Sequence, residues 1–145
     1  MLPEMVDKYP TPESLRDAVL IVDESIDFID PPTDWGAWSK AAGIEPLKPS
    51  GPRFSQADHA MDAALAGIGV ALGRRALIIK DIAEGRLVAP FRTALNVGAR
   101  FRFLCPEGAE DRPQIAAFRD WMLREIDKTA HIAASFSQTE VPSLA

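Results

Sequence analysis

The forty residues from Gly51 to Pro90, GPRFSQADHAMDAALAGIGVALGRRALIIKDIAEGRLVAP, decide the fold class. Their hydrophobic pattern predicts five alternating elements. These are a strand over 51–55, a helix over 56–66, a strand over 70–72, a helix over 74–84 and a strand over 86–89. A glycine follows each helix and favours its end, because glycine tolerates a left-handed backbone there. Short strands that alternate with helices indicate an α/β protein.

The segments before this stretch extend the pattern toward the N-terminus. Residues 11–17, which begin Thr-Pro-Glu, are typical of a short capped helix. The apolar run over 18–22 predicts a fully buried strand. Thr33 or Asp34 can then cap a helix that runs to Ala42 and ends at the following glycine.

One more strand and one more helix are expected after Pro90. Residues 100–104 alternate in hydropathy and predict a strand. Asp111 is expected to cap an amphipathic helix over 112–128, whose apolar side is suited to dock on a sheet. Residues 129–145 show little pattern and are expected to form a frayed tail.

The charge of the chain is unevenly spread and argues against a DNA-binding surface. The net charge is −5. Residues 1–50 carry ten acids and four bases, a net of −6, whereas residues 51–145 carry eleven acids and twelve bases, a net of +1. The sequence lacks a basic stripe that could follow a phosphate backbone. We therefore expect that this chain does not bind DNA by itself.

Cysteine usage and the apolar segments favour a cytoplasmic location. Cys105 is the only cysteine, which makes an internal disulfide impossible, and its apolar neighbours favour a buried, inert thiol over a nucleophile. No segment reaches the length of a transmembrane span. The first residues include Glu4 and Asp7 and lack the basic start of a secretory signal.

Residues that could carry catalysis or hold a metal do not form a recognisable constellation. His59 and His131 lack enough converging ligands for a metal site. Ser55 lies outside a G-x-S-x-G context, and the glycines of 67–69 lack the spacing of a dinucleotide fingerprint. The acidic run over 23–34 lacks the spacing of a calcium loop and is interpreted as a solvated loop. We expect a protein without enzymatic activity, metal or cofactor.

The turn Phe54-Ser55-Gln56-Ala57 is the best candidate for a binding site. It joins a predicted strand to a predicted helix, where free backbone N–H groups and the positive helix end converge. Such a turn suits a carboxylate or a small polar ligand. The alternative, that Ser55 only caps the helix, stays open. Trp35 and Trp38 lie three residues apart on another predicted helix; a core or interface pair is favoured, and a stacking platform for a ligand is the alternative.

Several motifs occur in an order that resembles one family. GP-x-F-S from Gly51, AG-x-GVALGR from Ala66 and EGRLV-x-PF from Glu84 resemble the effector-binding domain of LysR-type transcriptional regulators. Two further pairs of motifs are similar to the branch of the glycine-cleavage activator and the β-lactamase regulators. They are W-x-x-W with the following AG in 35–43, and LCPE with AFRDWML in 104–123. The resemblance runs from about residue 9 to residue 125.

The resemblance implies an α/β effector domain like the type 2 periplasmic binding proteins, which has two lobes. Residues 1–98 would form lobe two, residues 99–128 the return strand and terminal helix of lobe one, and residues 129–145 the tail. The family's DNA-binding winged helix, its linker helix and the start of lobe one are absent from these 145 residues. DNA would therefore be bound only through a segment outside them. A cloned fragment, a misassigned start and a truncated gene are all compatible with this expectation.

The resemblance also implies where a small-molecule effector would bind. Ser55, Gln56 and Ala57 would line the effector cleft, and Phe101 stands on the return strand where the branch often has a tyrosine. Ala57 stands where a serine is common, so two hydroxyl groups of the relatives are replaced. Binding of a small polar metabolite would bias the arrangement of a DNA-bound oligomer.

A stripe on the last helix suggests self-association. In the family this helix covers the sheet of lobe one, and here Phe118, Trp121 and Met122 need another surface. They could fold back on lobe two or pair with a second copy. Two alternatives to an effector-sensing fragment stay open: a free-standing small-molecule binding module, and a truncated product that only associates with itself or with an intact regulator.

Overall fold

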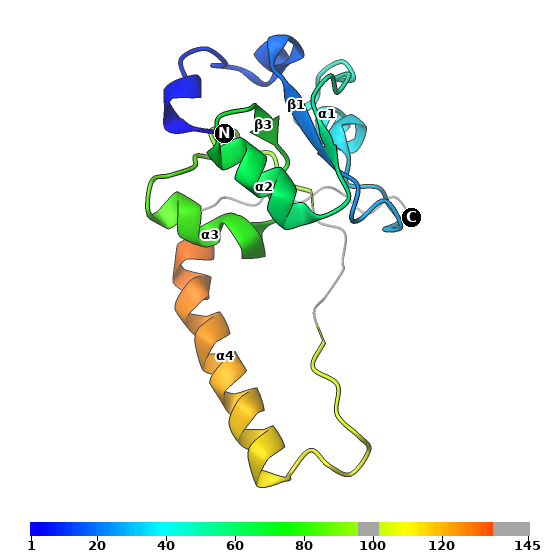
Figure 1. Cartoon of the computed structure of the whole chain (residues 1–145), viewed down its shortest axis with the longest axis vertical. Helices are drawn as coiled ribbons and strands as arrows, with labels where there is room; N and C mark the ends of the chain where they lie inside the picture. Colours follow the sequence, from blue (N-terminus) through cyan, green and yellow to red (C-terminus); the bar gives the residue numbers. More distant parts are fainter. Residues whose placement is uncertain (96–101, 135–145) are drawn as a thin grey trace. The chain divides into compact units, whose positions relative to one another are not determined.

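The computed structural model describes residues 1–95 and 102–134, with side chains as far as residue 128. The chain divides into two compact units, which are treated separately. Unit 1 comprises residues 1–95, and unit 2 comprises residues 102–134. The alternation of short strands and helices that the sequence predicts lies in unit 1 (Figure 1).

Unit 1 is built on a three-stranded parallel sheet with the order β2-β1-β3. Its strands are β1 (Leu20–Asp23), β2 (Arg53–Phe54) and β3 (Val70–Ala71). The central strand β1 pairs Asp23 with Phe54 on one side and Leu20 with Val70 on the other. Because all three strands are parallel, their carboxyl ends lie at the same edge of the sheet.

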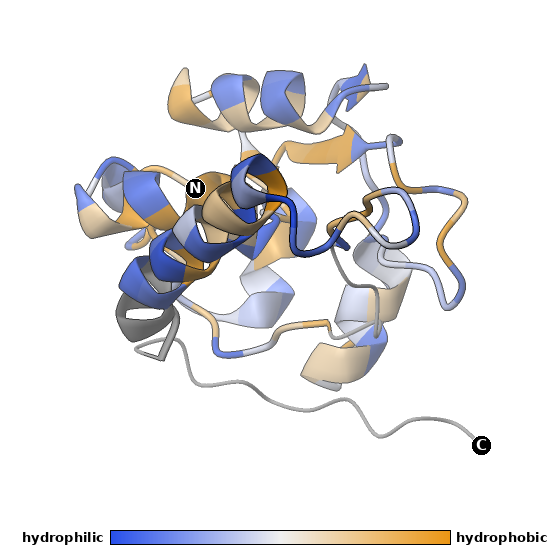
Figure 2. Ribbon diagram, turned by 90° about the horizontal axis from the view of Figure 1, so that it is seen from below, coloured by the Kyte–Doolittle hydropathy of each residue, from blue (hydrophilic) through white to orange (hydrophobic). Residues whose placement is uncertain are grey.

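Helices cover both faces of this sheet, as the fold class requires. They are α1 (Trp35–Ala42), α2 (Ala57–Leu65) and α3 (Arg75–Ala83), preceded by the 3₁₀ helices η1 (Pro3–Met5) and η2 (Pro12–Asp17). Leu20 packs in one core cluster with the tryptophans of α1, while Ile21 packs in another with α2. Neighbouring residues of a strand point to opposite faces, so α1 and α2 cover opposite faces of the sheet. In Figure 2 hydrophobic and hydrophilic residues occur on the same helices, as expected where one side covers a sheet.

The ends of α1 follow from local chemistry that the sequence signals. Of the two cap candidates, Asp34 fills the position, and its Oδ1 accepts a hydrogen bond from the backbone N–H of Ala37 at 2.8 Å. The helix ends at Gly43, which has a left-handed φ of 71°. Trp35 and Trp38 are 3% and 5% exposed, so the core interpretation of this pair is confirmed.

Gly69 shows why the AG-x-GVALGR motif places a glycine just before β3. A Cβ atom at this position would fall on the carbonyl oxygen of Val19, in the chain segment that leads into β1. The same carbonyl accepts a hydrogen bond from the N–H of Val70 at 2.9 Å. The absence of a side chain therefore lets the two backbones approach closely enough to begin the β1–β3 pairing.

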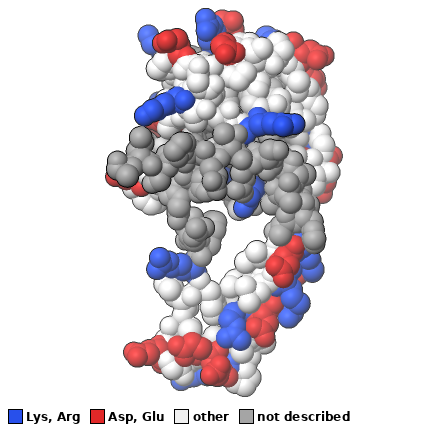
Figure 3. Space-filling model, turned by 180° about the vertical axis from the view of Figure 1, so that it is seen from behind, with Lys and Arg blue, Asp and Glu red and all other residues white. Residues whose placement is uncertain are grey.

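Unit 2 consists of an irregular segment followed by a single long helix, α4 (Pro113–Ala134). Three aromatic rings meet within it: Phe103 and Phe118 have ring centres 5.7 Å apart, and Phe118 and Trp121 stack at 5.6 Å. Phe118 and Trp121 nevertheless remain 48% and 50% exposed. Acidic and basic side chains are interspersed along α4 in Figure 3.

Two predicted strands are not strands in the structure. Residues 86–89 run without sheet pairing, since the N–H groups of Arg86 and Leu87 are used by the carbonyl of Asp81 at the end of α3. Leu87 is still buried, at 3% exposure. Of the strand predicted over 100–104, residues 102–104 are described and are irregular. Leu104 is 82% exposed. An alternating hydropathy pattern is not sufficient for a strand, because a strand also needs a neighbouring strand with which to form hydrogen bonds.

The last helix also differs from its prediction at both ends. The first backbone bond of α4 runs from the N–H of Ala116 to the carbonyl of Arg112, so Arg112, not Asp111, holds the cap position. The helix continues to Ala134, past the predicted end at residue 128. The six added residues extend regular structure into the segment expected to be frayed.

Candidate functional site

The carboxyl edge of the sheet in unit 1 is where polar groups from several elements meet. Each of the three strands leads into a helix from this edge. The connections after β1 and β2 lead to helices on opposite faces, which makes the junction between these neighbouring strands a topological switch point. In open α/β sheets, ligands bind in the crevice outside the carboxyl ends at such a point. Figure 1 shows β1, β3 and α2 around this region.

The predicted turn Ser55-Gln56-Ala57 lies at this edge, directly after β2. Ser55 and Gln56 are exposed and Ala57 is buried at the start of α2. Gln56, and not Ser55, occupies the N-cap position of α2. Among the described residues of unit 1, the Gln56 side chain makes no capping hydrogen bond to the first backbone N–H groups of the helix. The N–H groups of Ala57 and Asp58 therefore keep donor capacity, whereas the N–H of His59 donates to Oδ1 of Asp58 at 3.0 Å.

A hydrogen-bonded network at the same edge links the ends of β1 and β3. Asp23 Oδ1 accepts hydrogen bonds from the backbone N–H of Ser25 at 2.9 Å and from its hydroxyl at 2.6 Å. Asp23 Oδ2 accepts from Nε and Nη2 of Arg74 at 3.1 and 2.7 Å, and Nη2 also donates to Ser25 Oγ. Both carboxylate oxygens are therefore fully engaged, and the guanidinium of Arg74 is held over the end of β1.

Burial and hydrogen bonding shift the pKa of the Asp23 carboxyl in opposite directions. Burial raises the pKa of its carboxyl, but the hydrogen bonds from Ser25 and the contact with the Arg74 guanidinium lower it, and the net effect is a pKa below the usual value. The side chain of Asp23 is 8% exposed. It is therefore a buried, ionised acceptor at neutral pH.

A second ion pair at the edge is more exposed. Nε of Arg53 lies 2.5 Å from Oε1 of Glu24, and the two side chains are 59% and 35% exposed. The N–H of Glu24 donates to the carbonyl of Phe54 at 2.8 Å, which continues the β1–β2 pairing to the end of both strands. An exposed pair of this kind leaves both long side chains conformational freedom.

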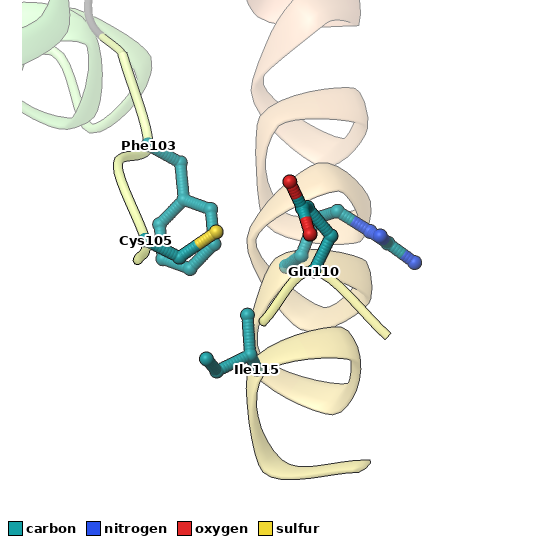
Figure 4. Close-up of a pocket in the computed structure, with 5 residues that line it drawn as sticks. Phe103, Cys105, Glu110 and Ile115 are labelled. Atoms are coloured by element: carbon teal, nitrogen blue, oxygen red, sulfur yellow. The ribbon is translucent and has the colours of Figure 1, made fainter. Parts of the chain in front are cut away.

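Two small hollows occur in the described residues, and both lie away from this edge. One of about 330 Å³ is lined by residues of η2 and of the segment 45–48 that leads toward β2, at the amino end of the sheet. The other, of about 220 Å³, belongs to unit 2 and is shown in Figure 4. Its lining residues are Phe103, Cys105, Glu110, Ile115 and Arg119.

The remaining residues that the sequence singled out are distributed over both units. Phe101 lies outside the described residues. Phe118 and Trp121 are half-exposed on α4, and Met122 is partly buried. Cys105 is only partly buried and lies in an irregular segment, so the expectation of a buried thiol is wrong.

Sequence reasoning missed the network around Asp23. It placed Asp23 in a solvated acidic run, whereas the side chain is almost fully buried and paired with Arg74, fifty-one residues away. A usable signal existed, because Asp23 and Arg74 each follow a predicted strand at its carboxyl end. Among the described residues, no three His, Cys, Asp or Glu side chains converge as metal ligands. No helix in the described part is long and apolar enough to cross a membrane.

A small parallel sheet covered by helices on both faces, with polar turns gathered at its carboxyl edge, defines an α/β ligand-binding class of protein. Within that class, the chain belongs to the LysR substrate binding domain family, which residues 5–127 match. The family resemblance and the expected fold, an α/β effector domain like the periplasmic binding proteins, are both confirmed.

Relatives of known role are transcriptional regulators. The chain is 33% identical over 114 residues to the glycine cleavage system transcriptional activator of Escherichia coli K12. The aligned residues cover 78% of this chain and 35% of that protein. It is 32% identical over 95 residues to the transcriptional activator AmpR of Providencia stuartii, covering 66% of this chain and 32% of that protein. The chain thus spans about a third of the length of these relatives. Both of these relatives are named as transcriptional activators.

A solved structure shows the same fold. The effector domain of the transcriptional regulator AmpR of Pseudomonas aeruginosa superposes with a TM-score of 0.60 at 22% identity. The match covers 92% of this chain and 61% of that domain.

Proposed function

We propose that this chain is the effector-sensing part of a LysR-type transcriptional regulator of the cytoplasm, without catalytic activity of its own. A small polar metabolite binds at the carboxyl edge of unit 1, against the turn Ser55-Gln56-Ala57. Its binding controls the oligomeric arrangement of the regulator on DNA. The DNA contacts belong to a segment outside these 145 residues.

The observation that carries the proposal is the junction between β1 and β2. Their following helices lie on opposite faces, and the polar turn after β2 stands beside the hydrogen-bonded end of β1. The first amides of α2 and the exposed side chains of Ser55 and Gln56 offer donors and acceptors to a polar ligand. Membership of a family named for substrate binding supports a ligand-binding role for the chain.

The test is a thermal-shift screen of the chain against amino acids and cell-wall fragments, followed by two matched variants. Ser55→Ala removes an exposed hydroxyl at the carboxyl end of β2, and Ser50→Ala removes an exposed hydroxyl before its amino end. We expect Ser55→Ala to reduce the ligand-induced shift by more than it reduces the unliganded stability, and Ser50→Ala to change neither. Equal losses with and without ligand would leave Ser55 without a role in ligand binding.

A separate consequence is that the chain alone does not bind duplex DNA specifically. The net charge of −5 and the interspersed acidic and basic side chains in Figure 3 support this. A gel shift at physiological salt is the measurement. Sequence-dependent binding at submicromolar concentration would overturn this part of the proposal.

Self-association without a DNA role is the second candidate function, and the exposed aromatic face of α4 favours it. Phe118, Trp121 and Ile126 are each about half-exposed, and stripes of this kind mark interfaces. Dimerisation through this face that no compound in the screen changes would support the second candidate function over the first.

A further inference from the structure

The network at the carboxyl edge bears on the chemical class of the effector. We infer that Arg74, held in place by Asp23 and Ser25, is a contact for an anionic group, so that the effector carries a carboxylate or an equivalent oxyanion. This inference rests on the proposed function of the edge and adds to it a ligand class and a residue.

The first step is the orientation of the guanidinium. Nε and Nη2 of Arg74 both donate to Asp23 Oδ2, and the remaining terminal nitrogen, Nη1, has no hydrogen-bond partner among the described residues. A guanidinium fixed along one side presents its other donors in a defined direction. The side chain of Arg74 is 35% exposed while that of Asp23 is 8% exposed, so the donor and not the carboxylate faces solvent.

The second step is the position of the guanidinium relative to the turn. Arg74 follows β3, but by pairing with Asp23 it reaches across to the end of β1. Asp23 is the sheet partner of Phe54, the residue before Ser55. The backbones of neighbouring strands lie about 4.8 Å apart, so the Arg74 guanidinium and the Ser55 turn stand at the ends of two adjacent strands. An anionic group on Arg74 and a second polar group on the turn therefore fit within one small metabolite.

The third step concerns the charge balance, which is not positive at this edge. Asp23, Glu24 and Asp58 stand against Arg53, Arg74 and Arg75, and the loop from β1 to α1 adds Asp27, Asp30 and Asp34. Preference for an anion must then come from directed donors, and not from a general positive field. Arg53 has the same chemistry at the same edge but belongs to an exposed pair with Glu24, which makes it a suitable control.

Acetate and acetamide are the probes, since they differ in charge and not in shape. The full chain is titrated with each at constant ionic strength, and the backbone amides and the Arg Nε–H signals are followed by NMR. We expect acetate in the millimolar range to shift the signals of Arg74, Ser25 and Ala57, with acetamide much weaker. Equal effects of the two probes overturn the inference while leaving a polar site at the edge. Absence of a shift with both probes also overturns it.

The variants assign the contact to one residue. Arg74→Met should weaken acetate binding about tenfold or more, the size expected for a lost charge-assisted hydrogen bond, and Arg53→Met should change it less than about twofold. Arg74→Lys keeps a positive partner for Asp23 but loses the fork of donors, so it should fold and still bind acetate more weakly. Unchanged binding in folded Arg74→Lys and Arg74→Met would overturn the role of Arg74. Any metabolite that stabilises the chain equally in wild type and Arg74→Lys would leave the proposed function standing without this inference.

Discussion

Two aromatic pairs with the same i, i+3 spacing differ in burial: one is buried in unit 1 and the other is half-exposed in unit 2. Trp35 and Trp38 on α1 have ring centres 5.8 Å apart, nearly perpendicular, and are almost fully buried. Phe118 and Trp121 on α4 stack at 5.6 Å and are about half-exposed. The indole N–H of Trp35 donates to the carbonyl of Ile21 in β1, and that of Trp38 donates to the carbonyl of Thr93 in the segment after α3, so α1 is tied to the sheet and to that segment. A helical stripe of aromatics therefore indicates a surface that needs covering, and the surrounding chain decides what covers it.

The largest effect is expected from removing a ring of the buried pair. Trp38→Ala should destabilise unit 1 by about 3–5 kcal/mol, because it leaves a cavity beside Trp35 and Phe91 and removes the hydrogen bond to the partly buried carbonyl of Thr93. Trp121→Ala is the matched change in the exposed pair and should leave the stability of unit 1 unchanged. Urea denaturation combined with hydrogen exchange of unit 1 amides measures both. Similar losses in unit 1 for the two variants would contradict the comparison.

A charge placed on the exposed pair tests whether a second copy covers it. Fully burying a large apolar side chain is favourable by about 1.5–3 kcal/mol, so we expect the unmodified chain to self-associate through α4. Trp121→Glu should give a monomer, because an unpaired carboxylate would be buried at the interface. Leu123→Glu adds the same charge at an exposed position about 200° around the helix from Trp121, and should leave assembly intact. Light scattering that shows a monomer for the unmodified chain at high micromolar concentration would disprove this.

Glycines extend the comparison to the backbone. Gly69→Ala should cost about 1–3 kcal/mol, because its Cβ meets the backbone of Val19 and pushes β3 from β1. Gly108 in unit 2 has a left-handed φ of 73° and open space around it, so Gly108→Ala should cost about 1–2 kcal/mol through strain, confined to unit 2. Hydrogen exchange at the N–H of Val70 should quicken in the first variant and not in the second. Protection of Val70 that survives Gly69→Ala would show that the strands tolerate a wider spacing.

The smallest effect concerns the buried carboxylate at the edge. Asp23→Asn should cost unit 1 about 1–2 kcal/mol at neutral pH by weakening the bonds to Ser25 and Arg74. The folded-state pKa of Asp23 is depressed, so its contribution is present above the unfolded pKa of about 3.9 and is lost as pH falls through the folded value. The Asp23→Asn variant should therefore lose less stability than wild type below about pH 4. Asp27→Asn, at an exposed position in the same loop, should follow the wild-type acid profile.

The sequence by itself determined the alternation of strands and helices over 51–84, the caps of α1 and the family. These features depend on periodicity, on cap residues and on glycines, which act within a few positions of one another. It also placed the Ser55 turn between a strand and a helix, while a ligand role for that turn stays a prediction.

Only the tertiary structure decided which partners distant residues find. The sequence predicts a solvated Asp23, because its partner Arg74 is fifty-one residues away and only the fold brings the two together. Residues 86–89 have the composition of a strand, but the N–H groups of Arg86 and Leu87 donate to the carbonyl of Asp81 in α3. These two groups are therefore not available for pairing with a strand. The two aromatic pairs show the same limit: local spacing defines a helical face, and burial depends on whether a sheet from elsewhere in the chain lies against it.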